Sequence, residues 1–241
     1  MLRYRLLVSV NVLAHVRRTS SCPESYSSSP VVGFLLQMSN LLWRLQNGEM
    51  PDSLHAKVWW ILIGTNDLVR GECSEEAIIL GILRLAEEIA AKRPGEVVVI
   101  QGLLPRTPHA DGSLTGSGGL SRAQKVMHTT SHHSNKHYFK SDDYPLWPSI
   151  QLINSELENF CAKHEHMVYF DAASLFLGSM GNKHFQSSEK VILKELMPDY
   201  AHLSVLGYEI MAKVIAQEVS RIVYDDDEDN HKSDSSGKIT R

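Results

Sequence analysis

Asp199 and His202 are the residues of this chain whose types and spacing best suit proton transfer. They lie three positions apart, just before an amphipathic stretch, and at this offset a turn can bring the carboxylate to the ring N–H of the imidazole. A carboxylate in that place fixes the histidine tautomer and stabilises the imidazolium that forms when the ring accepts a proton. The spacing also occurs by chance, so its position before the last predicted helix makes it a candidate acid–base pair of a hydrolase.

Asn66 is a second candidate, in the turn Gly64-Thr65-Asn66-Asp67 that follows a long apolar run. An asparagine in a turn usually hydrogen-bonds to its own backbone, and that ordinary role explains most such residues. At the carboxyl end of a strand, where open α/β sheets bind their ligands, the side-chain amide could instead donate to a developing oxyanion. Both interpretations of Asn66 stay open at this point.

Three apolar runs, at residues 57–63, 96–101 and 167–170, are the predicted strands that carry these residues. They alternate with helical patterns at 75–93, 150–163 and 206–224, where apolar residues recur every three or four positions. Near-continuous apolar strands alternating with helices are typical of a parallel sheet with crossover helices. The sequence therefore predicts an α/β fold.

Composition limits the classes of function that fit. The 241 residues, 43% of them hydrophobic, are enough for one domain, and a net charge of -4 without a basic face gives no support for nucleic-acid binding. No apolar run approaches the ~20 residues of a membrane span. Cys22, Cys73 and Cys161 lack metal-ligand spacing, which suggests free thiols and a cytoplasmic protein. Residues 1–18 are predicted to form a first strand, with a weak secretory signal as the alternative.

Two segments lack the periodicity of the predicted elements. Residues 107–146, rich in Ser, Gly, His and Lys, are predicted to form a surface insertion, and the acidic residues 225–241 are predicted to be disordered. The insertion carries four histidines, which we expect to be solvated rather than bound to a metal because no fixed spacing supports a site (His128, His132, His133, His137). No metal and no cofactor is expected.

Four blocks of the chain resemble a known family in their residues and order. They are residues 41–49, the Gly64-Thr65-Asn66-Asp67 turn, residues 102–106, and the segment 199–204 with Asp199 and His202. The chain is similar in these blocks to SGNH or GDSL-type serine hydrolases, and most similar to the catalytic alpha subunits of platelet-activating-factor acetylhydrolase. The resemblance implies a three-layer α/β/α fold of flavodoxin-like type over residues 39–224, interrupted by the insertion.

The resemblance also implies roles for the candidate residues. Asn66 would donate to the oxyanion, His202 would be the general base, and Asp199 would orient it. Gly64 and Asp67 would shape the turn that holds Asn66. The implied activity is hydrolysis of a small acetyl or short-acyl ester, without a cofactor, and the implied partners are a second copy of the chain or a regulatory protein.

The nucleophile of the family is the feature that this chain lacks. No Gly-Asp-Ser occurs in the sequence, and residues 1–38 form an atypical N-terminus in place of the family's first blocks. Ser9 stands at about the expected distance before Asn66 and is the candidate nucleophile, although without the Gly-Asp context that exposes the hydroxyl an ordinary strand serine is the favoured interpretation. The alternative to an esterase is therefore a catalytically inactive relative that serves as a binding or scaffolding subunit.

Overall fold

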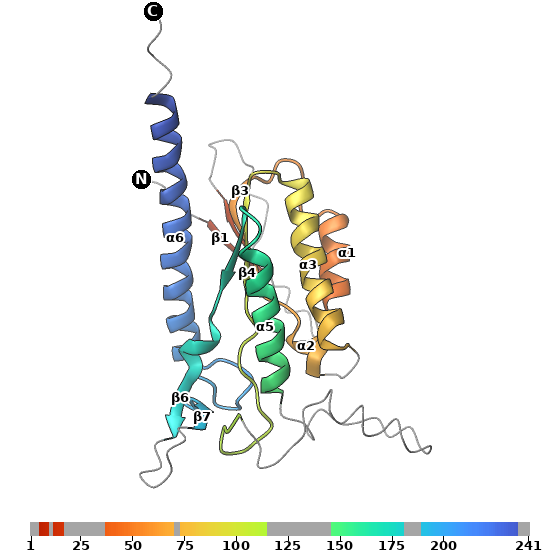
Figure 1. Ribbon diagram of the computed structural model, residues 1–241, viewed down its shortest axis with the longest axis vertical. Coiled ribbons are helices and arrows are strands. Elements are labelled where there is room, and N and C mark those ends of the chain that lie inside the picture. The colour runs from red at the N-terminus through yellow and green to blue at the C-terminus, as the bar shows by residue number, and fades with distance from the viewer. Residues whose placement is uncertain are drawn as a thin grey trace, which may run out of the picture.

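A computed structural model describes residues 5–9, 12–16, 37–69, 73–114, 146–180 and 189–235. Its strands form one five-stranded sheet and one two-stranded sheet (Figure 1). The elements in chain order are β1 Arg5–Ser9, β2 Val12–Val16, α1 Met38–Gln46, β3 Ala56–Ile61, α2 Thr65–Val69, α3 Glu75–Lys92, β4 Val97–Gln101, α5 Trp147–Cys161, β5 Met167–Phe170, the 3-10 helix η2 Ala173–Phe176, β6 Leu177–Met180, β7 Glu189–Ile192 and α6 Val205–Ser235.

The main sheet has the order β1-β2-β3-β4-β5, with two kinds of pairing. Strands β3, β4 and β5 are parallel, as the alternation of strands and helices predicts. Strands β1 and β2 form an antiparallel hairpin, and β2 is antiparallel to β3. Only two residues connect β1 to β2, and a connection this short allows a hairpin but no crossover between parallel strands. The predicted first strand is thus two strands of opposite direction.

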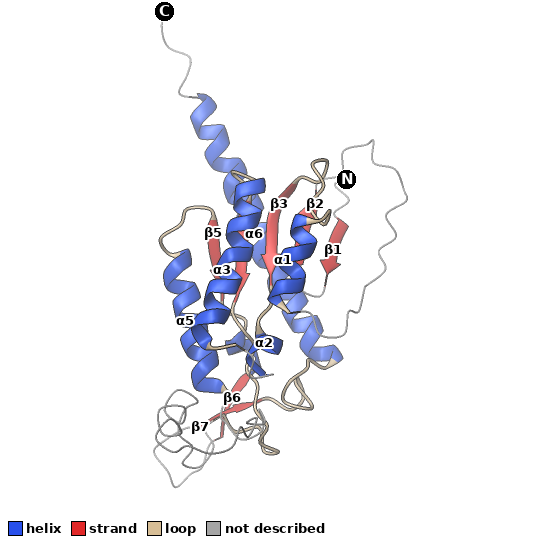
Figure 2. Ribbon diagram, turned by 90° about the vertical axis from the view of Figure 1, so that its right-hand side faces the viewer, coloured by secondary structure: helices blue, strands red, loops and turns tan. Residues whose placement is uncertain are grey.

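Helices cover the sheet on both faces, which confirms the three-layer α/β/α fold. Helices α1, α3 and α5 lie on one face and α6 on the other (Figures 1 and 2). Successive residues of β3 alternate between the layers, because Trp59 packs in the core beneath α1, α3 and α5 while Val58 and Trp60 pack in the core beneath α6. Burial on both faces explains why β3 is almost continuously apolar.

The predicted crossover helix is α3, and it begins where its sequence indicates. The hydroxyl of Ser74 accepts a hydrogen bond from the N–H of Ala77 at 3.3 Å, a standard N-terminal cap. Its apolar stripe is buried against the sheet (Ile78, Ile82, Leu85, Ile89). On its neighbouring face, a Cβ at Gly81 would lie 2.6 Å from the sulfur of Met38, so glycine lets α1 approach α3 closely.

The structure corrects the predicted insertion at both of its ends. Thr107, Leu114 and Leu146 are buried, Leu114 with 1% exposure, and Ser113 forms an antiparallel bridge to Val191 of β7. Loop 107–114 therefore packs on the β6–β7 hairpin, a two-stranded sheet that short runs of mixed polarity did not predict. Residues 115–145, with the four histidines, lie outside the described residues.

The acidic segment from residue 225 lies partly within a helix. Helix α6 continues as far as Ser235, into the segment whose disorder the sequence predicts. Extending a helix fixes one residue for each hydrogen bond gained, so a packed helix can propagate through residues that would not nucleate one. Residues 236–241 lie outside the described part. Among the described helices, none is long and apolar enough to cross a membrane.

Candidate active site at the carboxyl edge of the sheet

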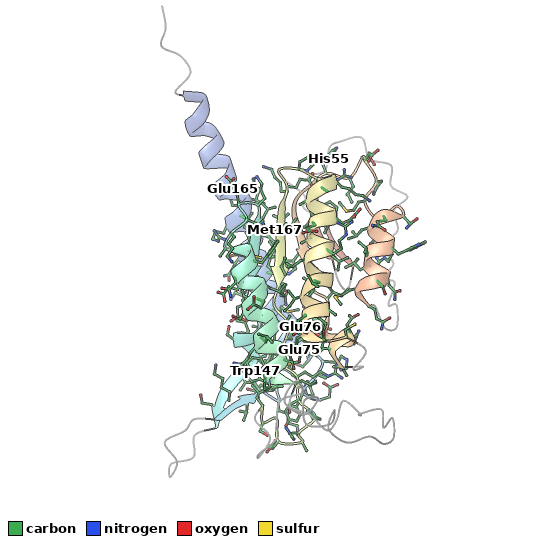
Figure 3. All side chains as sticks on the ribbon, turned by 45° about the vertical axis from the view of Figure 1, so that its right-hand side comes forward. His55, Glu75, Glu76, Trp147, Glu165 and Met167 are labelled. Carbon is green, nitrogen blue, oxygen red and sulfur yellow. The ribbon has the colours of Figure 1, made fainter. Side chains whose placement is uncertain are left out.

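The parallel strands β3, β4 and β5 all end at one edge of the main sheet, here called the carboxyl edge. Glu75 and Trp147, in the first turns of α3 and α5, lie at this end of the molecule, and His55 and Glu165 lie at the opposite end (Figure 3). The 64–67 turn follows β3 at the carboxyl edge, and α6 also begins at this end of the molecule (Figure 1). The fold thus places the candidate segments at one end, as the resemblance implies.

Gly64 and Asp67 are built into the core. Gly64 has a φ of +112°, which side-chain-bearing residues rarely adopt, and a Cβ there would lie 3.1 to 3.4 Å from Ile78, Ile82 and Leu103. Asp67 is 3% exposed, and its carboxylate accepts a hydrogen bond from the N–H of Met38 at 3.4 Å. That bond reaches the first turn of α1, where an anion is favoured by the helix dipole. Both residues have contacts that can hold the turn in shape.

Asn66 is the second residue of α2 and is partly exposed. No described residue makes a hydrogen bond with its side-chain amide, so the amide is not used by the turn in the way that asparagines in turns usually are. Gly64 and Asp67 are buried, whereas Thr65 and Asn66 are both partly exposed, so these are the two polar side chains that the turn presents toward solvent. An amide in this position can donate to a ligand at the carboxyl edge.

Asp199 and His202 are in direct contact. The ring Nδ1 of His202 lies 2.6 Å from Oδ2 of Asp199, and Oδ1 accepts hydrogen bonds from the N–H groups of Ala201 and His202 at 3.0 and 2.7 Å. Partial burial opposes ionisation of Asp199, but the bonds from His202 and Ala201 outweigh it and lower the pKa of its carboxyl to about 2. Asp199 is therefore ionised at neutral pH. The two side chains are 56% and 75% exposed, so the pair faces solvent.

The backbone of this turn is held from two sides. Tyr200 has a φ of 56°, and its carbonyl accepts a hydrogen bond from the N–H of Thr107 at 3.3 Å. After the turn, the hydroxyl of Ser204 accepts a bond from the N–H of Gly207 at 3.1 Å and donates to the carbonyl of Glu195 at 2.7 Å. Ser204 therefore caps α6, and its hydroxyl proton is already engaged by a backbone carbonyl.

Ser9, the candidate nucleophile, ends β1 at the carboxyl edge. It pairs with Val12 of β2, which in turn pairs with Ile61 near the end of β3. Two strand spacings of ~4.8 Å put the Ser9 backbone about 10 Å from that of β3. The backbone thus places Ser9 at the carboxyl edge, two strands away from β3.

Cysteine nucleophiles and metals have little support in the described part of the chain. Cys161 is a free thiol, and burial raises its pKa to about 11, so it stays protonated. No group of three His, Cys, Asp or Glu that could bind a metal ion occurs among the described residues.

A pocket of about 420 Å³, which no sequence pattern predicted, lies beside the edge strand β5. Side chains of α5, β5 and the β6–β7 hairpin line it, including Glu158, Tyr169, Asp171 and Lys190. Burial and then the charges of Asp171 and Glu158 raise the pKa of the Tyr169 phenol. Neither Asn66 nor His202 lines this pocket, so it is separate from the candidate active site.

Comparison with known proteins finds relatives of low sequence identity, all named as hydrolases. No protein-family model matches the chain. It is 25% identical over 187 residues to the platelet-activating factor acetylhydrolase IB subunits alpha1 of Homo sapiens and Bos taurus, an alignment that covers 78% of this chain. The chain spans 61% of the length of these relatives.

The solved structure of a GDSL-like lipase from Bacteroides thetaiotaomicron has the same fold. It matches with a TM-score of 0.52 and 18% identity, over 77% of this chain and 72% of the lipase. The resemblance seen in the four sequence blocks is thereby confirmed: this chain has the fold of the GDSL-type hydrolases, and its sequence is similar to the alpha1 subunits of platelet-activating factor acetylhydrolase.

Proposed function

We propose that this chain hydrolyses small carboxylic esters with an acetyl or short acyl group. The observation that carries the proposal is the 2.6 Å contact between His202 and Asp199, which leaves the rest of an exposed imidazole free to face a substrate. In the proposed site His202 is the general base, Asp199 orients it, and Asn66 donates to the oxyanion. Gly64 and Asp67 hold the turn that presents Asn66.

The hydrogen bonds of His202 set the direction of proton transfer. Because the ionised Asp199 can only accept, Nδ1 must donate to it, and the lone pair of the neutral ring is then on Nε2. Nε2 takes the proton of a serine hydroxyl as the serine oxygen bonds to the ester carbonyl carbon, and the carbonyl oxygen becomes an oxyanion. The ionised Asp199 stabilises the imidazolium formed in this step.

The second half of the reaction returns the proton. As the oxyanion collapses, the bond to the alcohol oxygen breaks and the alcohol leaves with the proton from His202. Water then attacks the acyl-serine, with His202 again as the base, and releases the acid. During both halves the amide of Asn66 would donate to the oxyanion, a contact whose removal lowers the rate by on the order of 10²–10³-fold in serine hydrolases.

Ser9 is the proposed nucleophile because β1 ends at the carboxyl edge, in the N-terminal region where the family carries its serine. Its backbone lies two strands from β3, and the proposal requires that its hydroxyl come within hydrogen-bond reach of Nε2 of His202.

The second candidate function is a catalytically inactive subunit that binds a partner. It is favoured by the absence of any Gly-Asp-Ser in the sequence and by the antiparallel strand β2 beside β3. The relatives in the comparison are themselves named as subunits. In this case the partner would be a second copy of the chain or a regulatory protein, and the Asp199–His202 pair would have no turnover to support.

Labelling and hydrolysis separate the two candidates. The purified chain is treated with a serine-directed fluorophosphonate probe and assayed with p-nitrophenyl acetate. The esterase proposal predicts a label on Ser9 that is lost in His202→Ala, with a rate loss on the order of 10⁴-fold. Ser179→Ala, which removes a serine from the end of β6, is the matched control and should keep full activity.

Each other result has a definite meaning. A label on a different serine would keep the reaction but replace the nucleophile. No label, together with hydrolysis equal to that of His202→Ala, would reject the esterase and leave the inactive subunit.

A further inference from the structure

Tyr200 has an unusual backbone conformation between the two residues of the acid–base pair. Its φ of 56° lies in the left-handed region, and it is the sole residue other than glycine with a positive φ in the described part of the chain. A bulky side chain disfavours this conformation, which persists where the surrounding structure holds it. Contacts from elsewhere in the fold must therefore hold Tyr200 in the left-handed conformation.

Loop 107–114, which follows β4, contacts Tyr200 in two ways. The N–H of Thr107 donates a hydrogen bond to the carbonyl of Tyr200 at 3.3 Å. The aromatic ring of Tyr200 lies against Gly112, so closely that a Cβ at Gly112 would be 2.7 Å from the Cε1 atom of the ring. Glycine at position 112 is therefore what allows the ring to lie there.

The loop is itself fixed to the rest of the fold. The hydroxyl of Thr107 donates to the carbonyl of Ser113 at 2.7 Å and accepts from the N–H of His109 at 3.2 Å. The N–H of Ile192, in β7, donates to the carbonyl of Gly112 at 2.9 Å. The loop continues directly from β4, its Thr107 bonds hold it together, and the Ile192 bond ties it to β7. Tyr200 therefore packs against a loop that is fixed to the sheet.

We propose that loop 107–114 is the element that positions the acid–base pair, with Thr107 and Gly112 as positioning residues. They hold Tyr200 in the left-handed conformation, and that conformation turns the carboxylate of Asp199 back toward the N–H groups of Ala201 and His202 and toward the His202 ring. Neither residue touches a substrate. The proposal deepens the proposed esterase and rests on it, but its geometry does not depend on which serine is the nucleophile.

The test compares two glycines with similar backbones. In Gly112→Ala the new methyl meets the Tyr200 ring, whereas in Gly95→Ala, at a φ of +84° against +76°, no atom lies within 4 Å of the new Cβ. The measurement is the titration of the Asp199 carboxyl followed by ¹³C NMR. We expect Gly112→Ala to raise the pKa of Asp199 from about 2 toward the ordinary range of an aspartate, and Gly95→Ala to leave it unchanged.

A rescue variant tests whether the clash with the Tyr200 ring causes the change in pKa. Adding Tyr200→Gly to Gly112→Ala removes the ring that the methyl would strike and places at position 200 a residue that adopts a positive φ freely. The double variant should regain part of the low Asp199 pKa. If Gly112→Ala does not fold, Thr107→Val, which removes the hydroxyl that ties the loop together, should raise the same pKa by a smaller amount.

The results distinguish this proposal from the proposed function. An Asp199 titration that is unchanged in both Gly112→Ala and Thr107→Val would overturn the positioning role, whatever the activity of the chain. A raised pKa in a chain that hydrolyses no ester would support the positioning role and reject the esterase. In an active chain, the same variants should lower kcat with little change in KM.

Discussion

The two turns of the candidate site are held in place by different forces. The 64–67 turn is fixed by packing: a Cβ at Gly64 would lie 3.1 to 3.4 Å from three apolar side chains of the core, and Asp67 is almost fully buried. The 199–202 turn is exposed and is fixed by hydrogen bonds between Asp199, His202 and the backbone around them. The first turn should therefore change with the stability of the whole domain, and the second with pH.

Among the substitutions that test this difference, Gly64→Ala should lower the unfolding free energy most. Gly64→Ala forces a side chain into a φ of +112° and places its methyl 3.1 to 3.4 Å from three core side chains, so the unfolding free energy should fall by about 3 kcal/mol. Urea denaturation measures the loss. Gly48→Ala, with a φ of +106° and no atom within 4 Å of its Cβ, is the matched control and should lose only about 1 kcal/mol. Equal losses would mean that packing does not fix the turn.

Asp67→Asn should have an intermediate effect. It keeps the shape of the side chain but removes the charge that accepts from the N–H of Met38, and we expect a loss of about 2 kcal/mol in unfolding free energy. Amide hydrogen exchange should become faster in the first turn of α1. Ser74→Ala removes the cap of α3 instead and should leave exchange in α1 unchanged. Since the asparagine oxygen can still accept this bond, exchange in α1 that does not respond to Asp67→Asn would show that the charge of Asp67 does not stabilise the first turn.

Asp199→Asn should have the smallest effect on stability and the clearest dependence on pH. The folded-state pKa of about 2 is below the value of 3.8 for an unperturbed aspartate, so the ionised form stabilises the fold above about pH 4. That contribution should disappear as the pH falls through about 2, and exposure to solvent should keep it below about 1 kcal/mol. The check is the difference in unfolding free energy between wild type and Asp199→Asn across this range. A difference that did not change with pH would contradict the local origin of the effect.

The parts of the fold that were predictable are those that bury regular apolar patterns. The strand around Trp59 and the helix with Ile78 and Ile82 repeat apolar residues at the period of their structure, and both are present. The Asp199–His202 contact was predictable too, because three positions of separation are enough to determine it once a turn forms. The elements and contacts that the sequence predicts are thus those determined by residue spacing over a few positions.

The parts that escaped prediction depend on contacts between distant segments. Loop 107–114 has no apolar period, yet Leu114 is buried because the loop pairs with β7 some 80 positions later in the chain. The left-handed conformation of Tyr200 has no signal in its residue type, since glycine and asparagine are the usual residues there. The reversed direction of β2 has no signal either, since a single apolar stretch does not show where one strand ends and the next begins.

The length of α6 has a consequence for local unfolding of the protein. Its 31 residues extend about 46 Å, whereas β3 extends about 20 Å, and the far end of the helix projects past the sheet (Figure 1). Its contacts with the sheet involve residues as far as Val223. Beyond that point the helix has twelve residues, 224–235, and an isolated helix shorter than ~12–15 residues is marginal in water. This end should therefore open and close many times for each opening of the packed part. Proteases should therefore cut the chain first just after Val223, while the domain that carries His202 is still folded.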